Sequence, residues 1–429
     1  MKPTTRLIPA ALAALALAAT AVPAHAQAPD APKRHVHFDL EAVQAILAVQ
    51  GLDGWLLADT SGQNRIAREL VDPVGSPTRS WFYFIPAQGQ PIILVHRADA
   101  GAFEQIAGTK IEYSGQRDLK RGLRKMFKGV RQLAMEYAPK SGIPSLSLVD
   151  AATVELVRST GVKIQSSARL VQFSKSLWGP MGRIAHYVAV HHLTKLRQEA
   201  LAYLAKQITH GYTVTEHDVQ QFIIRGYKVR GIVGPPPVVA AGANAADPNY
   251  QPTSEHSAKI KKGDLVLIGM SARLEQAPRP IYADVTWMAY VGDAVPKRYA
   301  QVFETLAQAR DAALELIQTR VERRRAVHGF EADQKARQVV AAAGYGDKFI
   351  HRTGHSLDTS LQGDGANIDD YEAHDTRMLV QGAGFTIEPG VYYKGDFGMR
   401  AEIDVYVGFG GVEVTTPVQT TITAILAKK

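Results

Sequence analysis

The 429-residue chain contains no cysteine. Disulfide bonds and thiolate metal sites are therefore excluded, and so is a cysteine nucleophile. Three further signatures are missing: the HExxH motif of many zinc peptidases, the GxSxG elbow of serine hydrolases, and the glycine-rich loops that bind phosphates or dinucleotides. The net charge of +8 is only a mild excess, and we expect no nucleic-acid partner.

Long apolar runs are also scarce, and the one at the N-terminus is short. The stretch MKPTTRLIPAALAALALAATAVPAHAQ has a basic start, an apolar centre and an Ala-His-Ala ending, which predict a signal peptide over residues 1–26 cut after Ala26. A membrane anchor is the alternative, but the run from Leu7 to Val22 contains Pro9 and is shorter than the ~20 apolar residues of a span. We expect a secreted or periplasmic protein without a membrane span in its mature form.

The remaining chain is long enough for two domains. An amphipathic helix followed by the strand-like segments WLLAD, WFYFIPA and PIILVH predicts a smaller α/β domain over residues 34–180. The pattern breaks at SLWGPMG, where we place the boundary. Residues 190–429 form the second domain, with helices expected from His191, over 297–320 and over 331–343.

Three acidic residues stand in otherwise apolar β segments of the second domain. Asp284 lies in IYADVTWMAYVGD, Glu388 in FTIEPGVYY and Glu402 in MRAEIDVYV. An ionised carboxylate inside a sheet is costly unless it meets a cation or is protonated. Each has an ordinary alternative: Asp284 faces solvent, Glu388 caps the bend before Pro389, or Glu402 pairs with Arg400.

The segments YADVTW, HRTGHSLD, FTIEPGVYY and MRAEIDV, in this order and spacing, resemble the pita-bread family that includes aminopeptidase P, prolidase and creatinase. The resemblance covers nearly the whole mature chain. It implies an α+β fold, in which a pita-bread domain follows a smaller α/β domain, and a homodimer. Active peptidases of the family hold two divalent metals with two aspartates, one histidine and two glutamates. Carried over by position, the resemblance implies the metal ligands Asp284, His355, Glu388 and Glu402. This donor set suits Mn, Co, Fe or Zn.

The sequence departs from the family pattern at three positions of this site. Gly269 stands in LVLIGMSAR, where the family has its first aspartate ligand. Asn249 in DPNY and Gln362 in LQGDG replace histidines, and amides cannot transfer protons near neutral pH. We therefore expect one divalent ion per chain at most, with a metal-free site as the alternative.

The loop HRTGHSLD itself carries two open assignments. His351 either contacts substrate and orients His355, or has a structural role. Arg352 and Asp358 occupy positions that the peptidases often fill with glycine. Arg352 either contacts an anionic group of the substrate or pairs with Asp358, and the sequence favours the pairing.

Three functions remain after these considerations. The first is a secreted Xaa-Pro peptidase-like metallohydrolase that acts on small peptides with a depleted site. The second is a metal-independent small-molecule enzyme, for which creatinase is the precedent, and the third is a non-catalytic binding protein. We rank the hydrolase first because four of the five metal-ligand positions keep their side chains.

The N-terminal segment yields a first prediction. Because the Ala-His-Ala sequence follows a short apolar region, the exported protein should begin at Gln27. N-terminal sequencing of the exported protein tests this, and recovery of intact Met1 from the membrane fraction would show an anchor instead.

Overall fold

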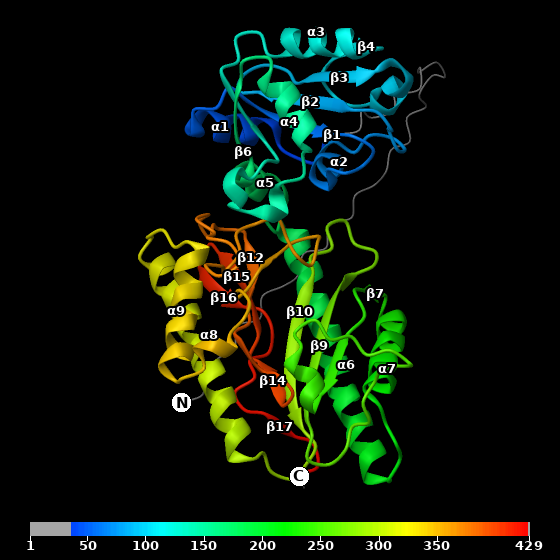
Figure 1. Ribbon diagram of the computed structural model, residues 1–429, viewed down its shortest axis with the longest axis vertical. Helices are drawn as coiled ribbons and strands as arrows, with labels where there is room; N and C mark the ends of the chain where they lie inside the picture. The colour runs from blue at the N-terminus through cyan, green and yellow to red at the C-terminus, as the bar shows by residue number, and fades with distance from the viewer. Residues whose placement is uncertain (1–35, 428–429) are drawn as a thin grey trace, which may run out of the picture.

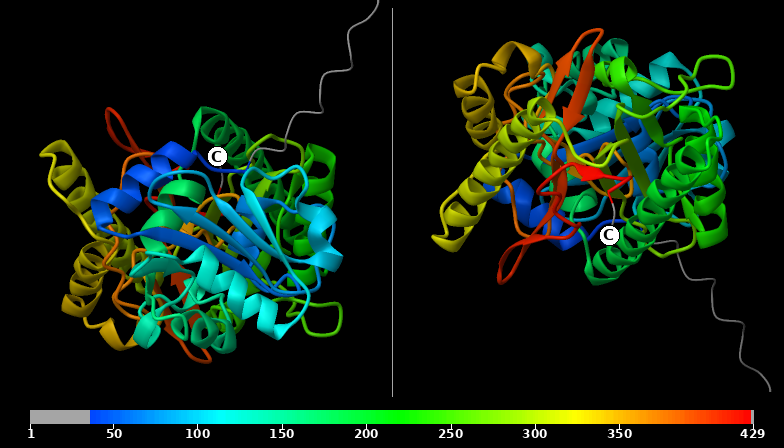
Figure 2. Two further views of the ribbon diagram at one scale, coloured as in Figure 1. Left: turned by 90° about the horizontal axis from the view of Figure 1, so that it is seen from above. Right: turned by 90° about the horizontal axis from the view of Figure 1, so that it is seen from below.

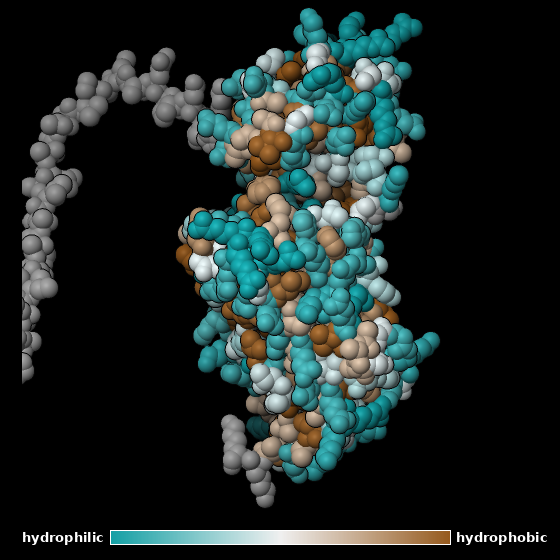
Figure 3. Space-filling view, turned by 90° about the vertical axis from the view of Figure 1, so that its left-hand side faces the viewer, coloured by the Kyte–Doolittle hydropathy of each residue, from teal (hydrophilic) through white to brown (hydrophobic). Residues whose placement is uncertain are grey.

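The computed structural model describes residues 36–427, so the predicted signal peptide lies outside the described residues. A smaller N-terminal domain stands on a larger C-terminal domain along the long axis, and the molecule narrows between them (Figures 1 and 3). No helix in the described part of the chain is long and apolar enough to cross a membrane.

The N-terminal domain is a mixed sheet with helices on both faces (Figure 2). Because side chains alternate along a strand, Trp55 and Leu57 of β1 face one core, whereas Leu56 and Ala58 face another. Helices α1, α2 and α5 cover the first face, and α3 and α4 cover the second. The strand order is β4-β3-β2-β1-β5-β6. The elements are α1 (Leu40–Gln50), β1 (Gly54–Asp59), α2 (Arg65–Val71), β2 (Trp81–Pro86), β3 (Ile92–His96), β4 (Thr109–Tyr113), α3 (Gln116–Met126), β5 (Gln132–Met135), α4 (Ala151–Arg158), β6 (Lys163–Ser166) and α5 (Ala168–Lys175).

The C-terminal domain places its strands between two pairs of helices (Figures 1 and 2). Helices α6 and α7 pack on β9 and β10, whereas α8 and α9 pack on the strands near the C-terminus. One sheet has the order β17-β10-β9-β7 with β8 also paired to β9, another has the order β11-β12-β15-β16, and β13 pairs with β14. The elements are α6 (Pro180–Thr209), α7 (Glu216–Arg230), β7 (Ile232–Val233), β8 (Val238–Ala241), β9 (Leu265–Leu274), β10 (Ala283–Tyr290), α8 (Lys297–Glu322), α9 (Gly329–Ala342), β11 (Ser356–Leu357), β12 (Gly384–Ile387), β13 (Gly390–Tyr393), β14 (Phe397–Arg400), β15 (Ile403–Gly408), β16 (Gly411–Val414) and β17 (Thr423–Ala424).

This architecture confirms the expected fold class, with one difference in a helix start. Helices α8 and α9 fall where the sequence predicts them, but α6 begins at Pro180 and not near His191. Proline is compatible with the first turn of a helix because the backbone N–H there needs no helical partner. Gly182 allows close packing, since a β-carbon there would lie 2.9 Å from Ile281. The segment SLWGPMG therefore contains the start of a helix.

A buried cluster of charges joins the two domains. The Lys175 ammonium, at the end of α5, lies 2.9 Å from Asp364, 3.3 Å from Asp358 and 3.2 Å from Glu69. Arg65 of α2 donates two hydrogen bonds to Asp364. Burial alone would raise the pKa of Asp364, but the hydrogen bond from Arg65 and the charges of Lys175 and Arg65 lower it overall.

The same cluster corrects the favoured pairing of Arg352 with Asp358. Asp358 is fully buried and accepts hydrogen bonds from Lys175 and Ser176, whereas Arg352 donates to Gln362. A buried carboxylate needs a cation close by, and the N-terminal domain supplies it. Sequence separation hid this partner.

Removal of the Lys175 ammonium should therefore destabilise the junction. We expect Lys175→Ala to lower the free energy of unfolding by about 3–5 kcal/mol, because two buried carboxylates lose their cation. The exposed Lys163 of β6 is the matched control, and Lys163→Ala should stay within about 0.5 kcal/mol of the parent. Denaturant unfolding measures both variants, and equal stabilities would contradict the role given to Lys175.

Candidate functional site

A cavity of about 440 Å³ in the C-terminal domain gathers the residues that the sequence singled out. They come from β9, β10, the segment 351–362 and the strands near the C-terminus. Of the predicted set, the lining contains Asn249, Gly269, Asp284, His351, Arg352, His355, Gln362 and Glu388. Glu402 is not part of this lining, but it is buried close enough to Asp284 and Glu388 for their charges to raise its pKa.

The β9–β10 pair sets the first wall of the cavity. Asp284 lies opposite Ser271, and Gly269 lies opposite Thr286. The Ser271 hydroxyl donates a 2.7 Å hydrogen bond to the Asp284 carboxylate. A β-carbon at position 269 would meet only ordinary contacts, the nearest at 3.5 Å from Val238. Position 269 thus has room for a side chain but offers no ligand.

His355 is held with one ring nitrogen toward the carboxylates. Its Nδ1 lies 3.1 Å from the Ser356 carbonyl oxygen, which requires a proton on Nδ1. Its Nε2 lies 3.3 Å from Glu388 and 3.6 Å from Asp284. Burial alone would lower the pKa of His355, but the hydrogen bond to Asp284 and the charges of Glu388 and Asp284 raise it. A metal ion at Nε2 would replace the second proton of this ring.

Glu388 is ionised and held by a cation. Arg400 donates a 2.8 Å hydrogen bond to one carboxylate oxygen, and the Thr386 hydroxyl donates to the other. Burial would raise the pKa of Glu388, but the charges of Arg400 and His355 lower it to about 2. The alternative pairing of Arg400 with Glu402 is therefore wrong, because the hydrogen bond from Arg400 goes to Glu388.

Glu402 and Asp404 are buried carboxyl groups with too few partners. Neither carboxylate oxygen of Glu402 has a hydrogen-bond partner among the described residues, and Oδ1 of Asp404 also has none. The other Asp404 oxygen accepts a hydrogen bond from the Asp284 backbone N–H. Burial and the charge of Asp284 raise the pKa of both groups well above the ordinary range. Sequence reasoning missed Asp404, although its spacing of two residues from Glu402 was a signal for a shared position beside the site.

A single divalent cation fits the chemistry of this donor set. His355 directs Nε2 toward the carboxylates, and Glu402 has two oxygens without partners. Within residues 36–427, however, no three His, Asp or Glu side chains are arranged to hold a metal ion as they stand. The hydrogen bond between Arg400 and Glu388 is one reason, because it directs a carboxylate oxygen to the guanidinium.

His351 forms a pair with Tyr392 at the edge of the cavity. Its Nδ1 lies 2.6 Å from the Arg352 carbonyl oxygen, and its Nε2 lies 2.8 Å from the Tyr392 hydroxyl. Burial lowers the pKa of His351, so the ring is neutral and its Nε2 accepts a hydrogen bond from the hydroxyl. The sequence gave no sign of Tyr392. Gln362 bonds to Arg352, and the Asn249 side chain has no hydrogen-bond partner in the described part of the chain.

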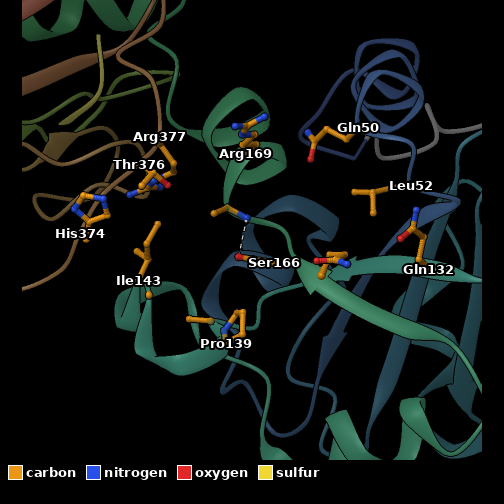
Figure 4. A pocket seen from close by; sticks show the side chains of 14 residues that line it. Gln50, Leu52, Gln132, Pro139, Ile143, Ser166, Arg169, His374, Thr376 and Arg377 are labelled. Carbon is orange, nitrogen blue, oxygen red and sulfur yellow. Dashed lines mark hydrogen bonds between the residues drawn. The ribbon is translucent and has the colours of Figure 1, made fainter. Parts of the chain in front are cut away.

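A second cavity of about 470 Å³ lies between the domains (Figure 4). Gln50, Gln132 and Arg169 line it from the N-terminal domain, and His374 and Arg377 line it from the C-terminal domain. It includes no carboxylate. It therefore lacks the donor set that the first cavity has.

The family model described as metallopeptidase family M24 matches residues 189–408. The chain belongs to this family. The fold comparisons agree with the two-domain architecture. The dipeptidase PepE from Mycobacterium ulcerans has a TM-score of 0.68 at 22% identity, over 90% of this chain and 96% of that one. A prolidase from Thermococcus sibiricus has a TM-score of 0.61 at 21% identity, over 90% and 98%.

Two curated M24-like relatives match in sequence. The putative dipeptidase YkvY of Bacillus subtilis is 32% identical over 209 residues, which is 47% of this chain and 52% of the relative. The Xaa-Pro dipeptidase of Lactobacillus helveticus is 29% identical over 168 residues, 38% of this chain and 40% of the relative. The chain thus spans about half the length of these relatives or less. The resemblance indicated by the sequence motifs is confirmed at the level of the family.

The unpartnered Glu402 yields a prediction about this M24 protein. Because the pKa of Glu402 is raised in the folded state, its contribution to stability is present below the unfolded pKa near 4.5 and lost as the pH rises. Glu402→Gln should therefore stabilise the metal-free protein at pH 7. It should also abolish most of the stabilisation by divalent ions, which reaches about 2.7 kcal/mol at 100 times the dissociation constant.

Thermal unfolding of both proteins from pH 4 to 8, with EDTA or with Mn²⁺, measures these effects. Glu304→Gln on the exposed face of α8 is the matched control and should behave like the parent. A metal response that is equal in the parent and in Glu402→Gln would exclude Glu402 as a ligand.

Proposed function

We propose that this protein is a metal-dependent hydrolase of the Xaa-Pro type that acts on small peptides with one divalent ion per chain. The observation that carries the proposal is the convergence of His355, Asp284 and Glu388 on one cavity whose second wall position, Gly269, offers no ligand. Membership of family M24 and the dipeptidase and Xaa-Pro dipeptidase relatives support the reaction class.

The ion would be held by His355, Asp284, Glu388 and Glu402. Such an ion acts as a Lewis acid and lowers the pKa of water. The Ser356 carbonyl fixes the His355 tautomer, so that Nε2 is directed to the carboxylates.

Other residues of the chain prepare the substrate side of the site. Arg400 keeps Glu388 ionised, which preserves a negative ligand at working pH. His351, neutral and bonded to Tyr392, is a group that can take up and release a proton at Nε2. Asn249 and Gln362 can position a peptide by hydrogen bonds but cannot transfer protons. This loss predicts turnover below that of a two-metal peptidase, since a missing acid or base costs roughly 10² to 10⁴ in rate.

A metal-independent small-molecule reaction is the second candidate, and one observation favours it. Arg400 and a protonated His355 already place two positive groups beside Glu388. With them, the site partly compensates its carboxylates without an ion. Persistent activity in excess chelator would support this candidate, or, in the absence of any turnover, a binding role.

We further propose that the protein is exported and works as a homodimer. The sequence of residues 1–26 supports export, and the resemblance to the pita-bread family supports the dimer.

The proposal predicts that the lost groups can be restored together. The triple variant Gly269→Asp, Asn249→His and Gln362→His should raise the metal content toward two ions per chain and increase Xaa-Pro cleavage. Position 269 has space for the carboxylate. The gain should be cooperative, because groups that act as a unit are not additive. Elemental analysis and peptide hydrolysis measure the two effects.

The control differs only in charge. Gly269→Asn with the same two histidines should fold and bind no second ion, because an amide is a poor ligand for these metals. The proposal is contradicted if the triple variant folds, binds two ions and leaves such peptides uncut, or if the parent already turns over at 1 to 10³ per second, as efficient enzymes do.

A further inference from the structure

The cavity contains two arginines of different availability. Arg400 is buried and donates to Glu388 over 2.8 Å. Arg352 is partly exposed, with 24% of its side-chain surface accessible. No lysine is part of the lining. Arg352 is therefore the cation that an entering molecule can reach.

The partners of Arg352 leave part of its guanidinium available. One terminal nitrogen donates to the Gln362 side-chain oxygen, a neutral acceptor. The other terminal nitrogen is 3.7 Å from Glu372, which is beyond a good hydrogen bond. A guanidinium has five N–H donors in a planar fork that fits a carboxylate. Glu372 is itself about half exposed and also accepts a hydrogen bond from the Arg352 backbone N–H.

The backbone around Arg352 is fixed with respect to the site. Thr353 donates through its N–H and its hydroxyl to the buried Asp333. Gly354 pairs with Ile368 in both directions. Arg352 thus stands between His351 and His355 on a firmly held segment, and its side chain begins at a constant distance from the donor set.

We propose that Arg352 selects substrates with a free carboxylate close to the bond that is cleaved, and that Glu372 acts as its counter-ion when no substrate is bound. This inference rests on the proposed function, whose site it shares. The carboxylates Asp284 and Glu388 would repel an anionic substrate, and Arg352 offsets that repulsion at the accessible side. The substrate class is then a short peptide whose C-terminal carboxylate reaches Arg352, as opposed to amidated or longer peptides.

The test compares an acid with its amide in the absence of turnover. Alanyl-proline and alanyl-prolinamide are titrated by calorimetry into the full protein kept in EDTA. A charged hydrogen-bonded pair corresponds to about a 10-fold to 100-fold difference in affinity, so the parent should prefer the acid by that factor. The preference should shrink with salt.

Variants of the two partners separate recognition from support of the loop. Arg352→Gly and Arg352→Gln should bring the acid-to-amide ratio near one, whereas Arg352→Lys should keep part of the preference. Glu372→Gln should raise the affinity for the acid, because the competing carboxylate is gone. In protein loaded with Mn²⁺, the Arg352 changes should raise KM for the acid more than they lower kcat.

Arg169 supplies the matched control. It is exposed on the interdomain cavity, away from the donor set, and has no hydrogen bond or ion pair to any described residue (Figure 4). Arg169→Gln removes the same charge and should leave the ratio unchanged. Equal binding of acid and amide by the parent overturns the inference, as does a ratio that survives Arg352→Gln in a folded protein.

The two proposals fail in different ways. A carboxylate preference without any turnover would contradict the proposed hydrolase and leave the role of Arg352 standing. Turnover of both acid and amide with equal KM would do the reverse.

Discussion

The C-terminal domain is organised around an excess of buried negative charge. Asp284, Glu388, Glu402 and Asp404 lie close enough together that the charge of Asp284 raises the pKa of Glu402 and of Asp404. Arg400 and a protonated His355 offset part of this charge. His186, 3.9 Å from Asp404, does not help, because burial lowers its pKa to about 4 and keeps it neutral. Without an ion, the remaining charge is removed by protons, and a divalent cation is the natural substitute for them.

The scaffold explains why these groups meet although the sequence separates them widely. The β9–β10 register places Asp284 on the face shared with Ser271, Gly269 and Thr286. Strand β12 leads to Glu388, and its partner β15 follows Glu402 directly. Helices on both sides cover the strands, so the carboxyl groups have little access to water. The charged cluster around Lys175 then joins the N-terminal domain to the loop that follows His355.

Much of this organisation was predictable from the sequence, for physical reasons. Alternating apolar strands and periodic helices reveal their elements locally, and acidic residues in apolar strands mark sites that need compensation. The partners of those acids were less accessible. Asp358 pairs with Lys175 and Glu388 with Arg400, and only the folded chain decides between such cations. The start of α6 was missed because proline and glycine were taken as a break, whereas they serve a first turn and a close helix contact. Whether the predicted ligands hold an ion stays a prediction.

The most direct test of the account is the metal content of the purified full-length protein after loading with excess Mn²⁺ or Zn²⁺ and removal of free ions. Elemental analysis should find close to one ion per chain, because His355 and the carboxylates supply one ligand set and Gly269 supplies nothing for a second. Two tightly held ions, or none, would contradict it.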